Sequence, residues 1–260
     1  MPAFAERPLT EFNLALGEAI SAIKFLQSSI WLRPRLNDLL NQQVIHGETR
    51  SKITNFLDQK DVDLSSLYRG TIVVICGATE YALRRITEEA VRLINKNAGN
   101  FDSISNTIRD QNIYRSGKAL STIFSPLDHL SFNYQELAHN LATCSTSAAN
   151  FSLNPEAFSH SISNATPRQI EDIFRWLGLK FEWDEFGKNT RLQKFFGLTK
   201  TKETAKATGS KLAAIVLARN KIAHSGIGGV TITDVDIITF SHFLKIFIEE
   251  FSRLISTKIQ

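Results

Sequence analysis

Apolar residues recur at helical intervals along most of the chain, whereas the strict alternation of a half-buried β-strand is found in very little of it. The stretch Thr10 to Leu32 has a helical period. Pro34 is expected to break this helix or to start another, because proline lacks the backbone N–H that a helix interior needs. The pattern predicts an all-α bundle. We expect residues 1–60 to form two or three helices, as an N-terminal extension or as the first layer of the bundle, and residues 61–260 to form the main helical domain.

Three later helices are predicted with defined ends. The stretch Tyr68 to Asn95 is apolar nearly all round in its first two turns, which is typical of a central, buried helix. Thr166 is expected to cap a helix that Gly178 ends, because threonine accepts an unpaired backbone N–H and glycine adopts the left-handed conformation at low cost. Thr233 is expected to cap the last helix, Asp234 to Lys258.

One late stretch, Leu212 to Gly226, combines an apolar stripe with polar residues that can do chemistry. We expect it to be an amphipathic helix that Ser210 caps and that Gly226 ends. Arg219 falls in the middle of the stripe, where its guanidinium must find an acceptor because burying an unpaired charge is costly. The stripe consists of Leu212, Ile215, Val216, Ile222 and Ala223.

Asn220 and His224 are four residues apart and therefore share one face of this helix. Histidine can both take and give a proton near neutral pH, and arginine can bind an anion. A cation, a polar orienting group and an acid–base group on one short helix suit phosphoryl transfer. A structural alternative stays open, in which Arg219 forms an ion pair with Glu80 or Glu171 and His224 is a solvated residue at the helix end.

The stretch RNKIAH, Arg219 to His224, resembles the R-N-x-x-x-H signature of HEPN-domain ribonucleases, and the RiboL-PSP-HEPN subgroup is the best match. Two further segments, GTIVVICGATEYALRRI and ATPRQIEDIF, carry the same resemblance. It implies a HEPN-like helical bundle with additional N-terminal helices. It also implies a metal-independent endoribonuclease in which the ribose 2′-OH attacks the adjacent phosphate and leaves a 2′,3′-cyclic phosphate. HEPN nucleases usually act as homodimers with a composite active site.

Residue roles follow from the resemblance. His224 would be the acid–base residue, Arg219 would stabilise charge on the phosphate, and Asn220 would hold His224 or the substrate in place. HEPN-like domains often have an acidic residue on an early core helix, which implies that Glu80 orients Arg219 or His224. The alternative for Glu80 is an intrahelical salt bridge with Arg84, four residues later.

Charge is distributed unevenly along the chain. The net charge is +4, but the window from Lys188 to Lys211 holds seven basic residues and one acid, so it carries +6 and the remainder carries −2. A basic block beside the motif suits a polyanion such as RNA. The alternative is a solvated lysine-rich loop. The expected substrate-binding residues are Lys188, Arg191, Lys194, Lys211 and Lys221.

The remaining composition predicts a cytoplasmic protein without a metal or another cofactor. Cys76 and Cys144 lack the spacing of a zinc site and are expected to be buried, reduced thiols. We find no signal peptide and no apolar run of membrane-spanning length, so no membrane partner is expected. Some HEPN toxins carry a tyrosine two residues after the histidine as an antitoxin modification site, whereas Gly226 occupies that position here.

The resemblance also implies a setting, because members of the family often belong to toxin–antitoxin or phage-defence systems. An antitoxin or defence protein is therefore an expected partner beside RNA and a second copy of the chain. Two other functions stay open. One is a non-catalytic HEPN module that binds RNA or a nucleotide and signals to a partner protein. The other is a helical interaction protein in which Arg219 makes a structural ion pair.

Overall fold

The computed structural model describes residues 4–41, 47–58, 64–124, 133–144, 150–225 and 231–259. Helices without any β-strand make up the regular structure of these ranges, which confirms the all-α prediction. None of these helices is both long and apolar enough to span a membrane. The elements are α1 (Glu6–Asn41), α2 (Gly47–Asp58), α3 (Leu64–Asn97), η1 (Phe101–Ser103), α4 (Asn106–Leu120), η2 (Ser121–Phe124), α5 (Tyr134–Thr143), α6 (Pro155–His160), α7 (Pro167–Trp176), α8 (Asp184–Gly187), α9 (Thr190–Phe196), α10 (Thr201–Ser225) and α11 (Asp234–Ile259).

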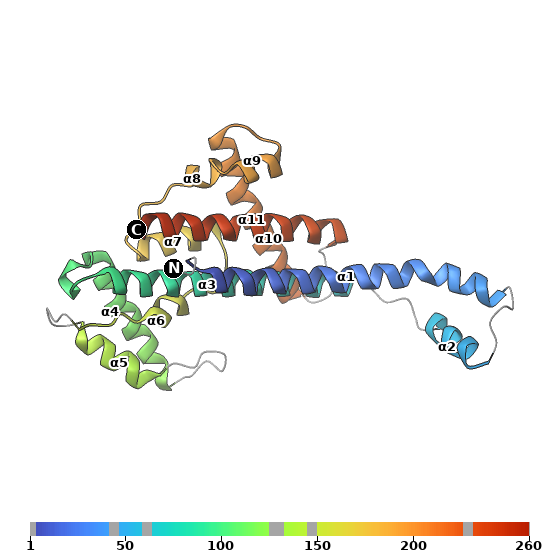
Figure 1. The fold of residues 1–260 in the computed structure, drawn as a ribbon, viewed down its shortest axis with the longest axis horizontal. Helices are drawn as coiled ribbons and strands as arrows, with labels where there is room; N and C mark the ends of the chain where they lie inside the picture. The colour runs from blue at the N-terminus through green and yellow to red at the C-terminus, as the bar shows by residue number, and fades with distance from the viewer. Residues whose placement is uncertain are drawn as a thin grey trace.

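Three long helices, α1, α3 and α11, run side by side and form the body of the molecule (Figure 1). The helices α4, α5 and α6 lie on one side of α3, and the short helices α8 and α9 lie beyond α11 on the opposite side (Figure 1). Helix α10 connects these parts, since it contacts α8 and α9 as well as α3 and α7.

The core is built on aromatic residues of α11 and aliphatic residues of α3. Phe186 stacks on Phe247 with ring centroids 4.8 Å apart, and Phe174 meets Phe251 edge-on at 5.6 Å. Such contacts fix α8 and α7 onto α11, because burial of large side chains is the main favourable term in folding. The fully buried residues of α3 include Ile72, Ile75, Leu83 and Ile86.

Helix α1 continues through Pro34, so the predicted break there is wrong. Pro34 is exposed, where water can hydrate the carbonyl group that the ring leaves unpaired. Phe12, Leu16 and Ile23 are buried in the same apolar cluster as α3 and α11. The first half of α1 is thus a layer of the bundle, while its second half runs beyond the end of α3 (Figure 1).

Helix α10 begins at Thr201, so the expected start at Leu212 with a Ser210 cap is wrong. The hydroxyl of the buried Thr208 donates to the Thr204 carbonyl group at 2.8 Å, which satisfies a polar group inside the helix. A Cβ at Gly209 would lie 4.0 Å from the Trp183 ring. Packing against α8 and Trp183 therefore carries the helix through a glycine–serine pair that locally favours a break.

The expected Thr166 cap, the glycine after α7 and the Thr233 cap are confirmed, whereas Gly226, the expected end of α10, lies outside the described residues. The Thr166 hydroxyl accepts from the Gln169 N–H, and Gly178 adopts φ 65 after the end of α7. Thr233 and Asp236 cap α11 reciprocally, because each side chain accepts from the backbone N–H of the other. Ala223, expected in the apolar stripe of α10, is instead exposed, whereas the other members of that stripe are buried.

Candidate functional site

Arg219 lies between α10 and α3, and three acceptors hold its guanidinium group. Nη2 lies 3.4 Å from Oε1 of Glu80 on α3, and Nη1 donates to Oδ1 of Asn164 at 3.2 Å and of Asn220 at 2.9 Å. Glu80 is therefore the acidic partner that the buried guanidinium of Arg219 was expected to need. Glu171, the other candidate, accepts a hydrogen bond from Trp183 Nε1 at 2.7 Å.

The loop before α7 positions two arginines, a role that the sequence pattern did not indicate. Asn164 receives Arg219, and the carbonyl group of Ile162 accepts from Arg84 Nε at 2.7 Å. Arg84 thus binds the loop backbone and does not form the salt bridge with Glu80 that was the alternative role for Glu80. In the sequence, the one feature that could have pointed to Asn164 is its position two residues before the Thr166 cap.

Glu80 sits in an environment that disfavours its charged form. Burial raises the pKa of its carboxyl group, and the nearby Arg219 and Arg84 offset only part of this effect. One helical turn earlier, burial together with the Glu80 charge raises the pKa of the Cys76 thiol to about 12. Cys76 is therefore a neutral thiol at physiological pH, and both cysteines are buried and free, as expected.

A small void lies beside the Arg219 side chain. Its lining includes Cys76, Glu80, Ala165 and Leu244 in addition to Arg219, and it has room for about one water molecule at most. Arg219 Nε is buried and has no acceptor among the described residues. The void is thus too small for a substrate, and any substrate must reach Arg219 from its solvent side.

Asn220 and His224 lie on the outer part of α10. Asn220 is half-buried and accepts from Arg219, while His224 is exposed in the last turn. At about 100° per residue, Arg219 and His224 point roughly 140° apart around the helix. Hydrogen bonds and one ion pair therefore join Arg219 to Asn164, Asn220 and Glu80, and His224 lies outside this group, one turn beyond Asn220.

The predicted basic residues are distributed over the α8–α9 region and α10. Lys188 and Lys194 are exposed at α8 and α9, next to the start of α10, and Arg191 forms an ion pair with Glu249 of α11. Lys211 lies over the Phe240 ring at 4.6 Å, and Lys221 is exposed within the Arg219–His224 motif. Most of the basic block from Lys188 to Lys211 thus lies at the opposite end of α10 from His224. Closeness in sequence does not reveal this separation.

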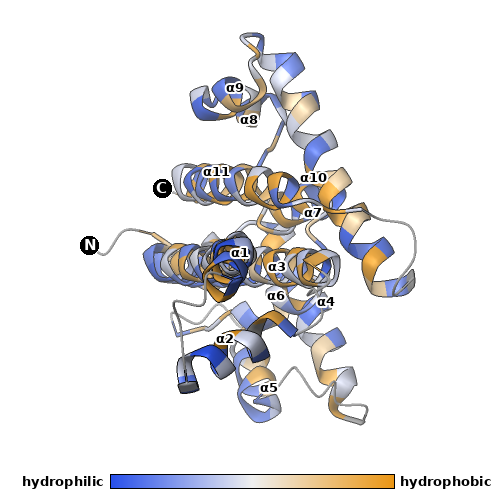
Figure 2. Cartoon of the chain, turned by 90° about the vertical axis from the view of Figure 1, so that its right-hand side faces the viewer, coloured by the Kyte–Doolittle hydropathy of each residue, from blue (hydrophilic) through white to orange (hydrophobic). Residues whose placement is uncertain are grey.

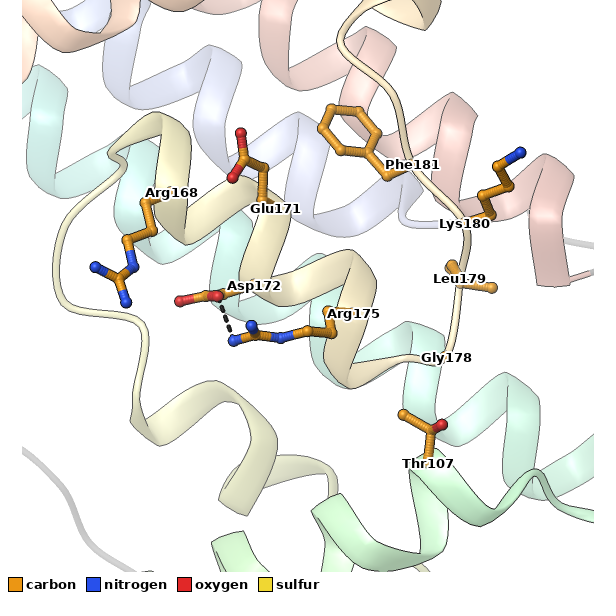
Figure 3. A pocket seen from close by; sticks show the side chains of 9 residues that line it. All are labelled: Thr107, Arg168, Glu171, Asp172, Arg175, Gly178, Leu179, Lys180 and Phe181. Carbon is orange, nitrogen blue, oxygen red and sulfur yellow. Dashed lines mark hydrogen bonds and ion pairs between the residues drawn. The ribbon is translucent and has the colours of Figure 1, made fainter.

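A broad, open hollow on α7 is separate from this group (Figure 3). Arg175 and Asp172 pair with each other across one turn of α7 inside the hollow (Figure 3). Its lining includes none of the expected catalytic residues. Among the described residues, no cluster of three or more histidine, cysteine or acidic side chains has the arrangement of a metal site.

Comparison with known proteins gives a family match over most of the chain. The family model described as RiboL-PSP-HEPN matches residues 28–257, which include the Arg219 group, His224 and the C-terminal part of α1. No curated protein and no solved structure matches the chain.

Proposed function

Because the chain belongs to the RiboL-PSP-HEPN family, we propose that it is a metal-independent endoribonuclease that cleaves RNA by attack of a ribose 2′-OH. The 2′-oxygen forms a bond to the adjacent phosphorus, and the bond from phosphorus to the 5′-oxygen breaks. The 2′-OH proton passes to a base, and the leaving oxygen takes a proton from an acid. The products are a 2′,3′-cyclic phosphate and a 5′-OH.

The observation that carries this proposal is that the guanidinium group of Arg219 is fixed in position by its neighbours. Three acceptors from three segments fix its position, and 24% of the side chain stays exposed. A cation that is fixed before the substrate arrives stabilises developing phosphate charge without reorganising, which makes electrostatic stabilisation effective. Glu80 and Asn164 would act as positioning residues, because they touch Arg219 rather than the substrate.

His224 is the proposed acid–base residue. It is exposed in the last turn of α10, where an RNA phosphate can approach it, and Asn220 lies one turn before it as a bridge to Arg219. One chain supplies one such histidine, whereas the reaction needs both a base and an acid. Two copies of the chain would supply two.

A homodimer with a composite cleft therefore forms part of the proposal. Four large aliphatic side chains are exposed near the N-terminal ends of α3 and α11, which lie at the same end of the bundle (Figure 1). Exposed aliphatic surface of this kind is typical of protein interfaces. The side chains are Val73, Val74, Val235 and Ile238.

We also propose a cytoplasmic toxin or phage-defence effector, controlled by an antitoxin or another defence protein. An RNA-cleaving enzyme damages its own cell unless it is restrained, and exposed apolar positions on α1 such as Phe25 offer a partner a surface to cover. The test is co-purification of a restraining protein whose release raises RNA cleavage.

The experiment that tests the nuclease is cleavage of mixed cellular RNA in EDTA by the wild type and His224→Ala. His139→Ala is the matched control, because His139 is also exposed but lies on α5. Cleavage by the wild type and the control alone supports the proposal. Equal cleavage by all three proteins, or cleavage that EDTA abolishes, contradicts it.

A non-catalytic HEPN module that binds RNA or a nucleotide and docks on a partner is the second candidate. It is favoured by the commitment of both Nη atoms of Arg219 to acceptors within one chain. This candidate predicts RNA or nucleotide binding by the wild type and by His224→Ala with equal affinity, and no cleavage by either.

A further inference from the structure

The outward side of α10 is one continuous stripe that joins the basic α8–α9 region to His224. Exposed residues recur along the helix at intervals of three and four, which places them within about 100° of one another. Figure 2 shows α10 running along one edge of the molecule, from α8 and α9 past α11 to the level of α3. We call these residues the α10 stripe: Lys202, Lys206, Ser210, Ala213, Leu217, Lys221 and His224.

The charged side chains of α10 are almost all basic. Among its 25 residues, Glu203 is the single acid, and Lys200, just before the helix, lies 2.9 Å from it. The stripe itself carries three lysines and His224 and no acid. Its middle consists of Ser210, Ala213 and Leu217, so no acidic side chain interrupts the path between the two basic ends.

The basic end of the stripe continues onto α8 and α9. Lys188, Lys194, Lys202 and Lys206 are all exposed, and none has a carboxylate within ion-pair distance in the described part of the chain. Arg191, by contrast, is neutralised by Glu249. These four lysines therefore keep their full attraction for a polyanion.

The length of the stripe sets the size of a ligand that can use both ends. Lys202 and His224 are 22 residues apart in one helix, which corresponds to about 33 Å at a rise of 1.5 Å per residue. A stacked nucleic acid strand advances by about 3.4 Å per nucleotide along its axis, so roughly ten stacked nucleotides cover this distance.

We propose that α10 is an RNA-binding track, on which a strand cleaved near His224 extends along the stripe to the lysines of α8, α9 and the start of α10. This inference rests on the proposed ribonuclease function and specifies its substrate as RNA of about ten nucleotides or more on one side of the cleaved bond. RNA too short to reach Lys206 gains nothing from the basic end.

The test uses single-stranded RNAs of one sequence with lengths of about 6, 12 and 24 nucleotides. We compare the wild type with Lys202→Gln/Lys206→Gln and with the control Lys96→Gln/Lys118→Gln, which removes two exposed lysines of α3 and α4. kcat/KM is measured for each RNA. Binding is measured by fluorescence anisotropy with each pair of substitutions in the His224→Ala protein, over a range of salt concentrations.

The track predicts that the wild type and the control gain about tenfold or more in kcat/KM between the shortest and the middle RNA, with little further gain. The stripe variant, Lys202→Gln/Lys206→Gln, loses most of this gain in kcat/KM. Its salt dependence of binding to the longest RNA falls by about 1.4 in log–log slope, because two phosphate contacts are lost at about 0.7 each.

Two results separate this inference from the proposed function. Cleavage that depends on His224 but is equal for all lengths, or equal in the stripe and control variants, overturns the track and leaves the nuclease standing. Length-dependent binding that the stripe variant loses, without any cleavage, supports the track and overturns the nuclease. Absence of both cleavage and length-dependent binding overturns both.

Discussion

Glu80 Oε1 and Arg219 Nη2 face each other at 3.4 Å across the α3–α10 interface, and 11% and 24% of their side chains are exposed. Although a guanidinium is this close, burial raises the pKa of Glu80. The desolvation of the carboxylate thus outweighs its attraction to Arg219 and Arg84. The pair therefore contributes little to the stability of the fold. This fits a role in positioning the Arg219 guanidinium for the reaction.

Glu80→Gln should raise the free energy of unfolding at neutral pH. The folded-state pKa of Glu80 lies above its ordinary value of 4.5, so the folded protein binds more protons than the unfolded chain between these two values. The contribution of Glu80 to stability is therefore fully present below pH 4.5 and is lost as the pH rises through the folded-state pKa. Urea denaturation across this range checks the prediction.

The difference between Glu80→Gln and the wild type should accordingly grow with pH from the acidic side and level off near neutrality. Arg219 keeps Asn164 and Asn220 as acceptors in this variant. A glutamine variant that is instead several kcal/mol less stable at neutral pH would show that the pair is structural.

Arg219→Ala should lose about 10²–10³-fold in kcat/KM for RNA, the usual loss on removing one group that stabilises transition-state charge. Its unfolding free energy should fall by less than the ~3–5 kcal/mol that a stranded buried charge costs, because Glu80 can take up a proton. Kinetics and denaturation of the same preparation measure both quantities. Arg219→Lys, which keeps the charge but cannot reach all three acceptors, should also lose most activity.

A stable Arg219→Ala protein with wild-type cleavage would contradict the catalytic role. Severe destabilisation of both Arg219 variants would instead support the alternative of a structural ion pair.

The sequence predicted the interior of this fold better than its boundaries. Helical periodicity and cap residues gave α3, α7 and α11, and the need of Arg219 for an acceptor pointed to Glu80. The continuation of α1 through Pro34 and the start of α10 at Thr201 depend on tertiary packing and solvent access, which local propensity does not contain.

Asn164 and the basic block show the same limit for the site. Asn164 reaches Arg219 across 55 residues of sequence, so no local spacing could reveal it. The short helix that the sequence predicts places Lys188 and Lys194 close to the motif. The longer helix instead separates them from His224 by most of the length of α10.

Asn164→Ala should lower kcat by about tenfold while leaving KM for RNA nearly unchanged, because it removes one acceptor that orients Arg219 and touches no substrate. Asn164→Asp retains a side-chain oxygen, now of a carboxylate, that can accept from Arg219, and should recover most of kcat. Steady-state kinetics of both variants provide the measurement. Equal effects of the two substitutions on KM alone would show that Asn164 binds RNA directly.

Gly187→Ala should destabilise the protein by about 2 kcal/mol or more, in the range of overpacked sites. A Cβ at Gly187 would lie 2.1 Å from the Thr201 carbonyl oxygen, so α8 and the start of α10 must separate. Gly117→Ala is the matched control, because a Cβ there meets nothing within 4 Å, and it should stabilise α4 by about 0.4–1 kcal/mol. Thermal denaturation distinguishes these directions, and equal stability of the two variants would contradict the close approach.

Cleavage of a defined RNA in EDTA, with and without a single 2′-deoxy substitution at the cleaved nucleotide, tests the central claim most directly. The account predicts that the wild type leaves a 2′,3′-cyclic phosphate and a 5′-OH on the all-ribose strand. The 2′-deoxy strand should stay intact at that position, and His224→Ala should cleave neither strand. Cleavage at the 2′-deoxy position, or products with a 5′-phosphate, would contradict attack by the 2′-OH and with it the proposed mechanism.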